Sequence, residues 1–245
     1  MDKSVYSCYV TSMLTLKLTS LPDTTLGIYK IKGTENRMPP RMLLLHPDAA
    51  VAFNALELAV GGLVYSDIWR SAESSLQARS EKRGVQRPGY SGHNFGISFD
   101  CAVDATLKKN KWTYGQLLDA CAQHGWHNFR RDRKRGFEDW HFNWLGDSSK
   151  DILGKCSVLT SQWQNAAELK IVELYGLHFT LTPMDIQYCL KQLKLYSGEV
   201  DGALGPLSNS AIQAFGRAWA LPQLEWSARS AMFQRTLAFV CSGRN

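Results

Sequence analysis

The amino-acid sequence predicts an α+β domain in about its first 145 residues, followed by a region made of helices only. Segments with the two-residue period of strands and segments with the 3.6-residue period of helices interchange up to residue 145. A stretch containing glycine and serine covers residues 146–149, and the periodic segments from residue 152 onward have helical spacing. We therefore expect one domain over residues 1–150 and a second over residues 160–245.

Local signals indicate the elements of the first domain. Residues up to about 45 are rich in alternating β-branched and aromatic side chains, which favours strands and turns. His46-Pro47-Asp48 opens a helix that Gly61 ends, and Thr113 caps a helix that Gly125 ends. Strands are expected within residues 63–69, 92–103 and 137–145, and a helix or an ordered loop over residues 71–84.

Helices are expected throughout the second domain, because its apolar residues recur at helical spacing. These helices cover residues 161–174, 184–195, 206–220 and 227–240.

The composition describes an ordinary globular protein and excludes few functions. Of 245 residues, 44% are hydrophobic and 20% are charged, which is enough apolar material for a packed core. The net charge of +6 favours association with an acidic polymer, whether nucleic acid, anionic lipid or bacterial cell wall. Six scattered cysteines without a C-x-x-C pair argue against a cysteine zinc site, and we expect most to be reduced and buried.

The chain shows no apolar run long enough for a membrane span. Its N-terminus lacks the continuous apolar segment of a signal peptide, since polar and apolar residues alternate there. We expect synthesis in the cytoplasm, so a substrate outside it would require another route of release.

Two short segments carry residue types that suit a metal centre: His93 and Asp100 in the first, Glu138 and His141 in the second. A catalytic zinc ion takes three nitrogen or oxygen ligands and keeps an open position for water. A carboxylate outside the ligand set must then move the proton of the water. From spacing alone an alternative stands, in which His93 lies in a loop, Asp100 on the surface and His141 in the core.

The spacing of these residues constrains how they can meet. His93 and Asp100 are seven residues apart, and Glu138 and His141 are three apart. Because both separations are odd, a regular strand would point each pair to opposite faces. We therefore expect His93 on a bend permitted by its flanking glycines, Asp100 on a strand, and Glu138 at the entrance of the next strand.

The two segments, S-G-H-N-F-G-I-S-F-D and E-D-W-H, resemble the S-x-H-x-x-G-x-A-x-D and E-x-W-H signatures of the LAS metallopeptidases. This family includes zinc D-Ala-D-Ala carboxypeptidases and dipeptidases and phage L-Ala-D-Glu endopeptidases. The resemblance implies a hedgehog/D,D-peptidase-like fold, a small antiparallel sheet flanked by helices. It implies one Zn²⁺ ion held by His93, Asp100 and His141, with Glu138 as catalytic base. Ser98 departs from the pattern, because alanine is usual there.

The same resemblance suggests residues that contact substrate. Arg70, in I-W-R-S, matches the arginine of the family's G-[YF]-R-S motif and is expected to stabilise substrate and transition-state oxygens. Ser91 opens the first signature and Trp140 lies within the second, and both are expected to bind substrate.

Other residues near these motifs are weaker candidates. Asp139 competes with Glu138, but its side chain is expected to point away. His46, His124, His127 and His178 are expected to be structural or superficial. The basic run of Arg130, Arg131, Arg133, Lys134 and Arg135 is either a solvated loop or a rim that attracts the carboxylates of peptidoglycan stems.

A second resemblance covers residues 171–221, which are similar to L-x-x-L-G-x-Y-x-G-x-V-D-G-x-x-G-P and the helix after it. This motif marks a three-helix peptidoglycan-binding domain. Gly216 departs from it, because glutamine usually follows the phenylalanine there. The alternative is a helical appendage without affinity for the wall.

The two resemblances imply a zinc peptidase that hydrolyses peptidoglycan stem peptides and acts on the wall after release, as a phage endolysin or virion-associated lysin does. We expect a monomer that binds bacterial peptidoglycan and no nucleic acid. The alternatives are a bacterial D-alanyl-D-alanine carboxypeptidase and a non-catalytic wall-binding protein with a structural metal.

Overall fold

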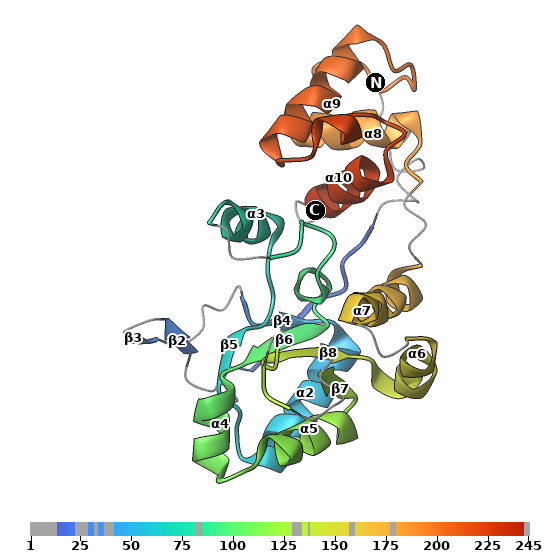
Figure 1. Ribbon diagram of the computed structural model, residues 1–245. Helices are drawn as coiled ribbons and strands as arrows, with labels where there is room; N and C mark the ends of the chain where they lie inside the picture. Colours follow the sequence, from blue (N-terminus) through green and yellow to red (C-terminus); the bar gives the residue numbers. More distant parts are fainter. Residues whose placement is uncertain are drawn as a thin grey trace. The chain divides into compact units, whose positions relative to one another are not determined.

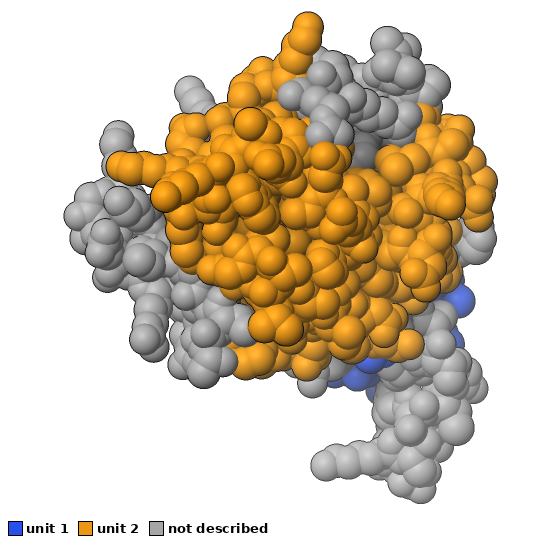
Figure 2. Space-filling model, turned by 90° about the horizontal axis from the view of Figure 1, so that it is seen from below, with its two compact units in different colours: residues 1–16, 71–89, 177–245 blue, residues 17–70, 90–176 orange. Residues whose placement is uncertain are grey.

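The computed structural model describes residues 14–22, 29–31, 34–36, 42–81, 85–128, 134–136, 138–156, 160–176 and 180–242. The chain forms two compact units, coloured in Figure 2. The sheet unit comprises residues 17–70 and 90–176, and the helical unit comprises residues 1–16, 71–89 and 177–245. Residues 160–176 thus belong to the sheet unit and residues 71–89 to the helical unit. The domain limits of 1–150 and 160–245 concern function and stay a prediction.

A four-stranded antiparallel sheet lies at the centre of the sheet unit, with helices around it (Figure 1). Its strands are β5 (Tyr65–Asp67), β6 (Ser98–Cys101), β8 (His141–Trp144) and β7 (Trp126–Asn128), in that order. The expected small antiparallel sheet flanked by helices is therefore present. Two further pairs confirm strands before residue 46: β1 (Thr19–Ser20) with β4 (Leu44–Leu45), and β2 (Tyr29–Ile31) with β3 (Thr34–Asn36).

Helix α2 (Pro47–Val60) begins and ends where its sequence signals predict. His46 caps its N-terminus, and the imidazole Nδ1 accepts a hydrogen bond from the N–H of Asp48 at 3.4 Å. Pro47 occupies the first turn, where no N–H is needed. Gly61 adopts the left-handed conformation that ends the helix.

Aromatic packing joins α2 to one face of the sheet. The ring of Phe53 lies 5.3 Å from Tyr65, 5.3 Å from Phe99 and 5.8 Å from Trp126, measured between ring centroids. All four side chains are fully buried. Because successive residues of a strand point to opposite faces, Asp100 projects from the face of β6 that is turned away from this core.

The sequence predicts three helices of the sheet unit, α2 among them, and misses two. Helix α5 (Tyr114–Gln123) has the expected cap, in which Thr113 and Gln116 bond each other's backbone amides. Helix α4 (Val103–Asn110) is too polar to show an apolar stripe, and α6 (Ser149–Lys155) is too short. Helix α7 (Thr160–Tyr175) matches its expected bounds.

Glu57 is a buried acid of α2 whose carboxylate accepts the N–H of Leu63 at 2.6 Å. Burial raises the pKa of Glu57, although hydrogen bonds from Tyr65 and Leu63 oppose the shift. The unfolded chain therefore loses this proton at a lower pH than the folded protein, so folding stability falls as pH rises from about 4.3 through the raised pKa.

Replacing Glu57 with glutamine removes this titration and keeps an oxygen for Leu63. As pH rises from 4 to 7, we expect the free energy of unfolding of Glu57→Gln to increase relative to that of wild type. Urea titrations of both proteins at pH steps of about 0.5 measure this difference. A difference between the two proteins that stays constant with pH would contradict the raised pKa.

The helical unit contains α3 (Ala72–Ser80), α8 (Pro183–Gln192), α9 (Pro206–Ala218), the 3₁₀ turn η5 (Gln223–Glu225) and α10 (Ala231–Ser242). Helix α3 confirms the expected element at residues 71–84. Helix α10 begins later than residue 227, because Ser230 bonds the N–H of Phe233 at 3.0 Å and so marks the start of the helix. Trp226 lies so close to Gly216 that a side chain there would overlap the indole, which explains why no glutamine stands at this position.

Gln187 organises the loop between α8 and α9. Its Oε1 accepts the N–H groups of Asp201 at 3.0 Å and Gly202 at 2.7 Å, and its Nε2 donates to Asp201 Oδ1 at 2.8 Å and Ala203 O at 3.0 Å. The side chain is fully buried. Asp201 and Gly202 of the motif therefore form a loop whose polar groups bond the buried side chain of Gln187.

Truncation of Gln187 leaves buried N–H groups without acceptors, which costs about 1–3 kcal/mol. We expect Gln187→Ala to lower the free energy of unfolding by that amount in urea titrations. The exposed Gln192→Ala on the same helix is the control and should stay within about 0.5 kcal/mol of wild type. Equal effects of the two substitutions would show that the loop holds without Gln187.

Two expectations about the whole chain can be compared with the described residues. None of the helices there is long and apolar enough to cross a membrane. Cys101, Cys121, Cys156, Cys189 and Cys241 are buried and form no disulfide, while Cys8 lies outside the described residues.

Candidate metal centre

Three separate segments bring His93, Asp100 and His141 together. Asp100 on β6 and His141 at the start of β8 are directly paired in the sheet. His93 lies on the 3₁₀ turn η3 (Gly92–Phe95), just before β6. The structure therefore confirms the expected bend at His93 and the strand position of Asp100.

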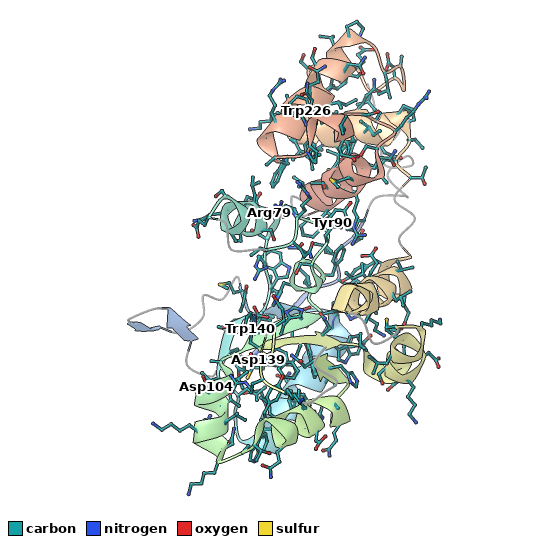
Figure 3. All side chains as sticks on the ribbon, viewed as in Figure 1. Arg79, Tyr90, Asp104, Asp139, Trp140 and Trp226 are labelled. Atoms are coloured by element: carbon teal, nitrogen blue, oxygen red, sulfur yellow. The ribbon has the colours of Figure 1, made fainter. Side chains whose placement is uncertain are left out.

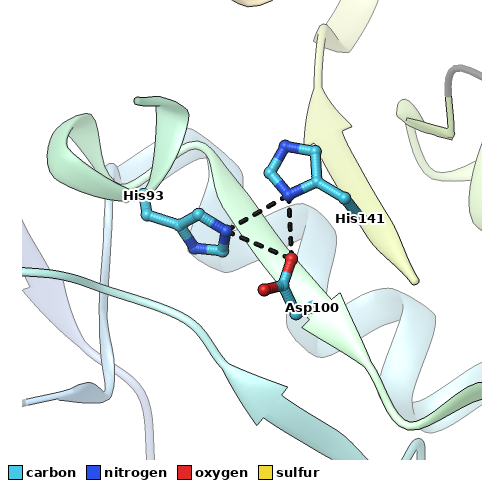
Figure 4. Close-up of side chains that lie close together, drawn as sticks. All are labelled: His93, Asp100 and His141. Atoms are coloured by element: carbon cyan, nitrogen blue, oxygen red, sulfur yellow. Dashed lines mark hydrogen bonds and ion pairs between the residues drawn. The ribbon is translucent and has the colours of Figure 1, made fainter. Parts of the chain in front are cut away.

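The three side chains meet at short distances, as Figure 4 shows. Asp100 Oδ1 lies 2.8 Å from His141 Nδ1 and 3.2 Å from His93 Nε2, and the two imidazole nitrogens are 3.2 Å apart. Two nitrogens bound tetrahedrally to one zinc ion are about 3.3 Å apart, because each bond is about 2 Å long. This donor set therefore fits a divalent metal ion, and among the described residues it is the group that can hold one.

The imidazole of His93 is oriented by a second hydrogen bond. Its Nδ1 lies 2.6 Å from the carbonyl oxygen of Ile68, which can only accept, so Nδ1 carries the proton. The lone pair of Nε2 is then directed to the other two side chains. A hydrogen bond of this kind behind a histidine ligand sets the tautomer and the ring angle.

Charge and burial act together on the group. Burial alone would lower the pKa of His93, but the charge of Asp100 and its hydrogen bond outweigh burial, and the pKa is raised. Burial alone would raise the pKa of Asp100, but His93 and His141 hold it well below its usual range. Asp100 is therefore an anion, the form that a metal ligand requires, and a metal competes with a proton for His93.

Ser91 caps η3, which accounts for its place in the first signature. Its hydroxyl oxygen accepts the N–H of His93 at 3.3 Å, and its own N–H donates to Asn94 Oδ1 at 3.4 Å. The side chain is buried. Substrate contact by Ser91 stays a prediction beside this structural contribution. From the other side, the hydroxyl of Tyr175 on α7 donates to Phe95 O at 3.1 Å and braces η3.

Arg70 lies beside η3 and is linked to it through the backbone. Its N–H donates to His93 O at 3.2 Å, and its carbonyl oxygen accepts from Asn94 Nδ2 at 2.8 Å. Its guanidinium is bonded through Nε, at 3.1 Å, and Nη2 to Asp67 Oδ2. Among the described residues these bonds use two of the five guanidinium N–H groups. The role of Arg70 toward substrate stays a prediction.

The second signature forms a turn ahead of β8. Glu138, Asp139 and Trp140 make up this turn, so the strand begins at residue 141 and not at 137. Figure 3 labels Asp139 and Trp140 there. Asp139 is buried, and its carboxylate accepts from Arg135 and from the N–H of Gly136, which occupies it within the turn. Trp140 is 40% exposed. Glu138 is not part of the metal group.

Most of the remaining candidates do not join the metal group. His46 caps α2, His124 ends α5, and His127 lies on β7. His178 and residues 130–133 of the basic run lie outside the described residues. Arg135 is exposed and donates to Asp104 at 2.8 Å as well as to Asp139, and the part that the run plays stays a prediction.

Three groups that hold the site residues in place could not be identified from the sequence. The Ile68 carbonyl is backbone and leaves no trace in the sequence. Asn94 and Asn128 donate to backbone carbonyl oxygens. Their residue type alone does not reveal these bonds. Asp67 stands three residues before Arg70, and this opposite-charge spacing was the one available clue.

Comparison with known proteins adds little beyond the geometry. No family model matches the chain. No curated protein matches it either. One similar solved structure is described as "Structure of the LdcB LD-carboxypeptidase reveals the molecular basis of peptidoglycan recognition". It is 18% identical, with a TM-score of 0.38, over 62% of this chain and 84% of that chain. A similarity this low supports no functional argument.

Proposed function

We propose that this protein is a zinc-dependent peptidase that hydrolyses a peptide bond in the stem peptides of bacterial peptidoglycan. The observation that carries the proposal is the convergence of His93, Asp100 and His141, whose ligand atoms lie within 4.8 Å of one another. Two imidazoles and one carboxylate are a donor set of catalytic zinc sites. The substrate class rests on the two sequence resemblances.

Hydrolysis explains the site better than a structural metal does. Structural zinc sites are closed by four protein ligands, commonly cysteines. Here the group among the described residues offers three ligands of nitrogen and oxygen type, and no cysteine belongs to it. A carboxylate at Glu138, three residues before His141, has a use in hydrolysis and none in a structural site.

Each side chain then has a defined task. When bound, the zinc ion supplies positive charge that acidifies water and polarises the scissile carbonyl. Glu138 takes a proton from the attacking water as its oxygen bonds to the carbonyl carbon, and gives the proton to the amine as the C–N bond breaks. Arg70 donates hydrogen bonds to the carbonyl oxygen as that oxygen gains negative charge. Ser91 and the exposed ring of Trp140 contact the stem peptide.

The helical unit is assigned to wall binding in this proposal. Attachment raises the local concentration of substrate, so the peptidase site need not supply all the affinity. The net charge of +6 favours an acidic polymer such as the wall. A monomeric phage endolysin or virion-associated lysin of hedgehog/D,D-peptidase-like fold fits these features. The alternative, a D-alanyl-D-alanine carboxypeptidase, differs from an endolysin in its product, which is free D-alanine.

The test uses the zinc-loaded full chain and purified peptidoglycan. We expect new free amines, their loss when 1,10-phenanthroline removes the metal, and their return when zinc is restored. Mass spectrometry of the products identifies the bond: free D-alanine indicates a carboxypeptidase, and a separated stem peptide indicates an endopeptidase. Binding to peptidoglycans of several stem compositions without release of amines would overturn the proposal.

A further inference from the structure

The backbone at Glu138 is unusual for a residue with a side chain. Its φ is 58°, in the left-handed region that glycine enters freely and that a β-carbon makes unfavourable. Such a conformation persists only where the surroundings enforce it. The contacts of this turn therefore indicate which groups enforce its conformation.

Asn128 is the side chain that contacts both ends of the turn. Its Nδ2 donates to the carbonyl oxygen of Glu138 at 3.0 Å and to that of His141 at 2.7 Å. Asn128 lies on β7, where its backbone pairs with Phe142, next to the start of β8. The amide thus bridges the proposed base and the metal ligand from a rigid position in the sheet.

The turn explains how Glu138 and His141 can serve one site. On a regular strand two residues three apart point to opposite faces. The left-handed bend at Glu138, closed by the bond from the N–H of His141 to Glu138 O at 3.2 Å, breaks that alternation. Further bonds contact the turn between its ends. The N–H of Cys101 donates to Trp140 O at 2.7 Å, Tyr114 donates to Asp139 O at 3.1 Å, and the Asp139 carboxylate accepts the N–H of Gly136 at 3.2 Å.

We infer that Asn128 is a positioning residue, which holds the 138–141 turn in its left-handed form and thereby places His141 for the metal and Glu138 for the water. The inference rests on the proposed function for the part played by Glu138. The placement of His141 follows from contacts alone and can be tested through metal binding, without any reaction.

The first test measures the dissociation constant of Co²⁺, with its visible absorption spectrum, in wild type and in Asn128→Ala. Removal of a group that orients a ligand costs about 10- to 100-fold in metal affinity. We expect a loss of this size and a changed Co²⁺ spectrum. Asn110→Ala is the matched control, since it removes one amide bond to a helix carbonyl, that of Thr106 at 3.2 Å, and should leave the affinity unchanged.

The same comparison in a Glu138→Gly background separates positioning from general destabilisation. Glycine adopts positive φ without strain, so the turn keeps its form without Asn128. We expect the loss of Co²⁺ affinity on Asn128→Ala to shrink to about threefold or less there, against the 10- to 100-fold of the parent. Equal losses in the two backgrounds, or no loss in either, would overturn the inference. If Asn128→Ala does not fold, Asn128→Ser carries the same comparison.

Activity provides a second readout that depends on the proposed function. With saturating zinc, Asn128→Ala should lower kcat by about 10-fold or more and leave KM within about threefold, because the substrate contacts are unchanged. If wild type releases no amines, the proposed function fails, while the Co²⁺ comparison still decides whether Asn128 positions His141. If wild type is active and the Asn128 variants keep both affinity and kcat, only this inference fails.

Discussion

The Glu138→Gln protein is expected to bind zinc as wild type does and to lose about 10²- to 10⁴-fold in kcat, the range that a general acid–base group contributes. Glutamine has nearly the shape of glutamate but cannot take a proton from water. Metal should remain, because the ligand group consists of His93, Asp100 and His141. Amine release from peptidoglycan measures kcat, and metal analysis of the dialysed protein measures zinc content.

Two further substitutions make this result specific. Glu73→Gln, an exposed position of α3, changes the same chemical group at a residue outside the metal group and should leave kcat unchanged. Asp139→Asn keeps an oxygen that can accept the N–H of Gly136, so the turn can form. A loss in Asp139→Asn as large as that in Glu138→Gln would assign the proton transfer to Asp139 and contradict the role of Glu138.

The parts of the fold that follow from neighbouring residues could be predicted from the sequence. The ends of α2 follow from His46, Pro47 and Gly61, which act within one helical turn. The alternation of buried Phe99 with Asp100 follows from the period of a strand. The bend at His93 follows from the odd separation between it and Asp100, since only a non-strand position lets both face one point.

Features that depend on distant contacts could not be predicted in this way. Helix α7 belongs to the sheet unit, which its own sequence does not reveal. Its Lys170 is 3% exposed, lies 4.7 Å from the ring of Trp144 and pairs with Glu173 at 2.6 Å. A lysine on a helix usually indicates a solvent-exposed face. The ring of Trp144 and the carboxylate of Glu173, which compensate the burial of Lys170, are evident only in the folded structure.

At the metal site, too, local features could be predicted from the sequence and distant contacts could not. Residue types and spacing indicate which side chains can bind a metal, but the groups that orient them come from elsewhere in the chain. Ser98, which departs from the family pattern, donates to Asn143 on the neighbouring strand, and a side chain at Gly92 would overlap both groups. A local pattern cannot show such a contact, because the two strands are far apart in sequence.

Replacement of Gly96 is expected to destabilise the protein and to disturb the metal centre. It ends η3 in the left-handed conformation, with φ of 67°. A β-carbon there would lie 2.6 Å from the backbone nitrogen of His46 and 2.9 Å from the carbonyl carbon of Leu45. These are backbone atoms at the start of α2, and the N–H of His46 also donates to Gly96 O at 2.8 Å. Neither partner can move without separating η3 from α2.

Gly96→Ala should therefore lower the free energy of unfolding by about 2–5 kcal/mol, since left-handed strain costs about 1–2 kcal/mol and overlap in a packed region about 1–3 kcal/mol. Gly61→Ala is the matched control. Its φ is 66°, and a β-carbon there meets no atom within 4 Å, so strain alone applies and we expect a loss of about 1–2 kcal/mol. The difference between the two variants in urea titrations isolates the overlap.

Metal affinity should separate the two glycines further. Displacement of η3 moves His93, so zinc binding should weaken in Gly96→Ala and stay at the wild-type value in Gly61→Ala, where the change lies at the far end of α2. If the two variants lose the same stability and bind zinc equally well, η3 tolerates a side chain at Gly96. The close approach to His46 would then contribute nothing to the position of His93, and the other contacts of its ring, such as the bond to Ile68 O, would suffice to place it.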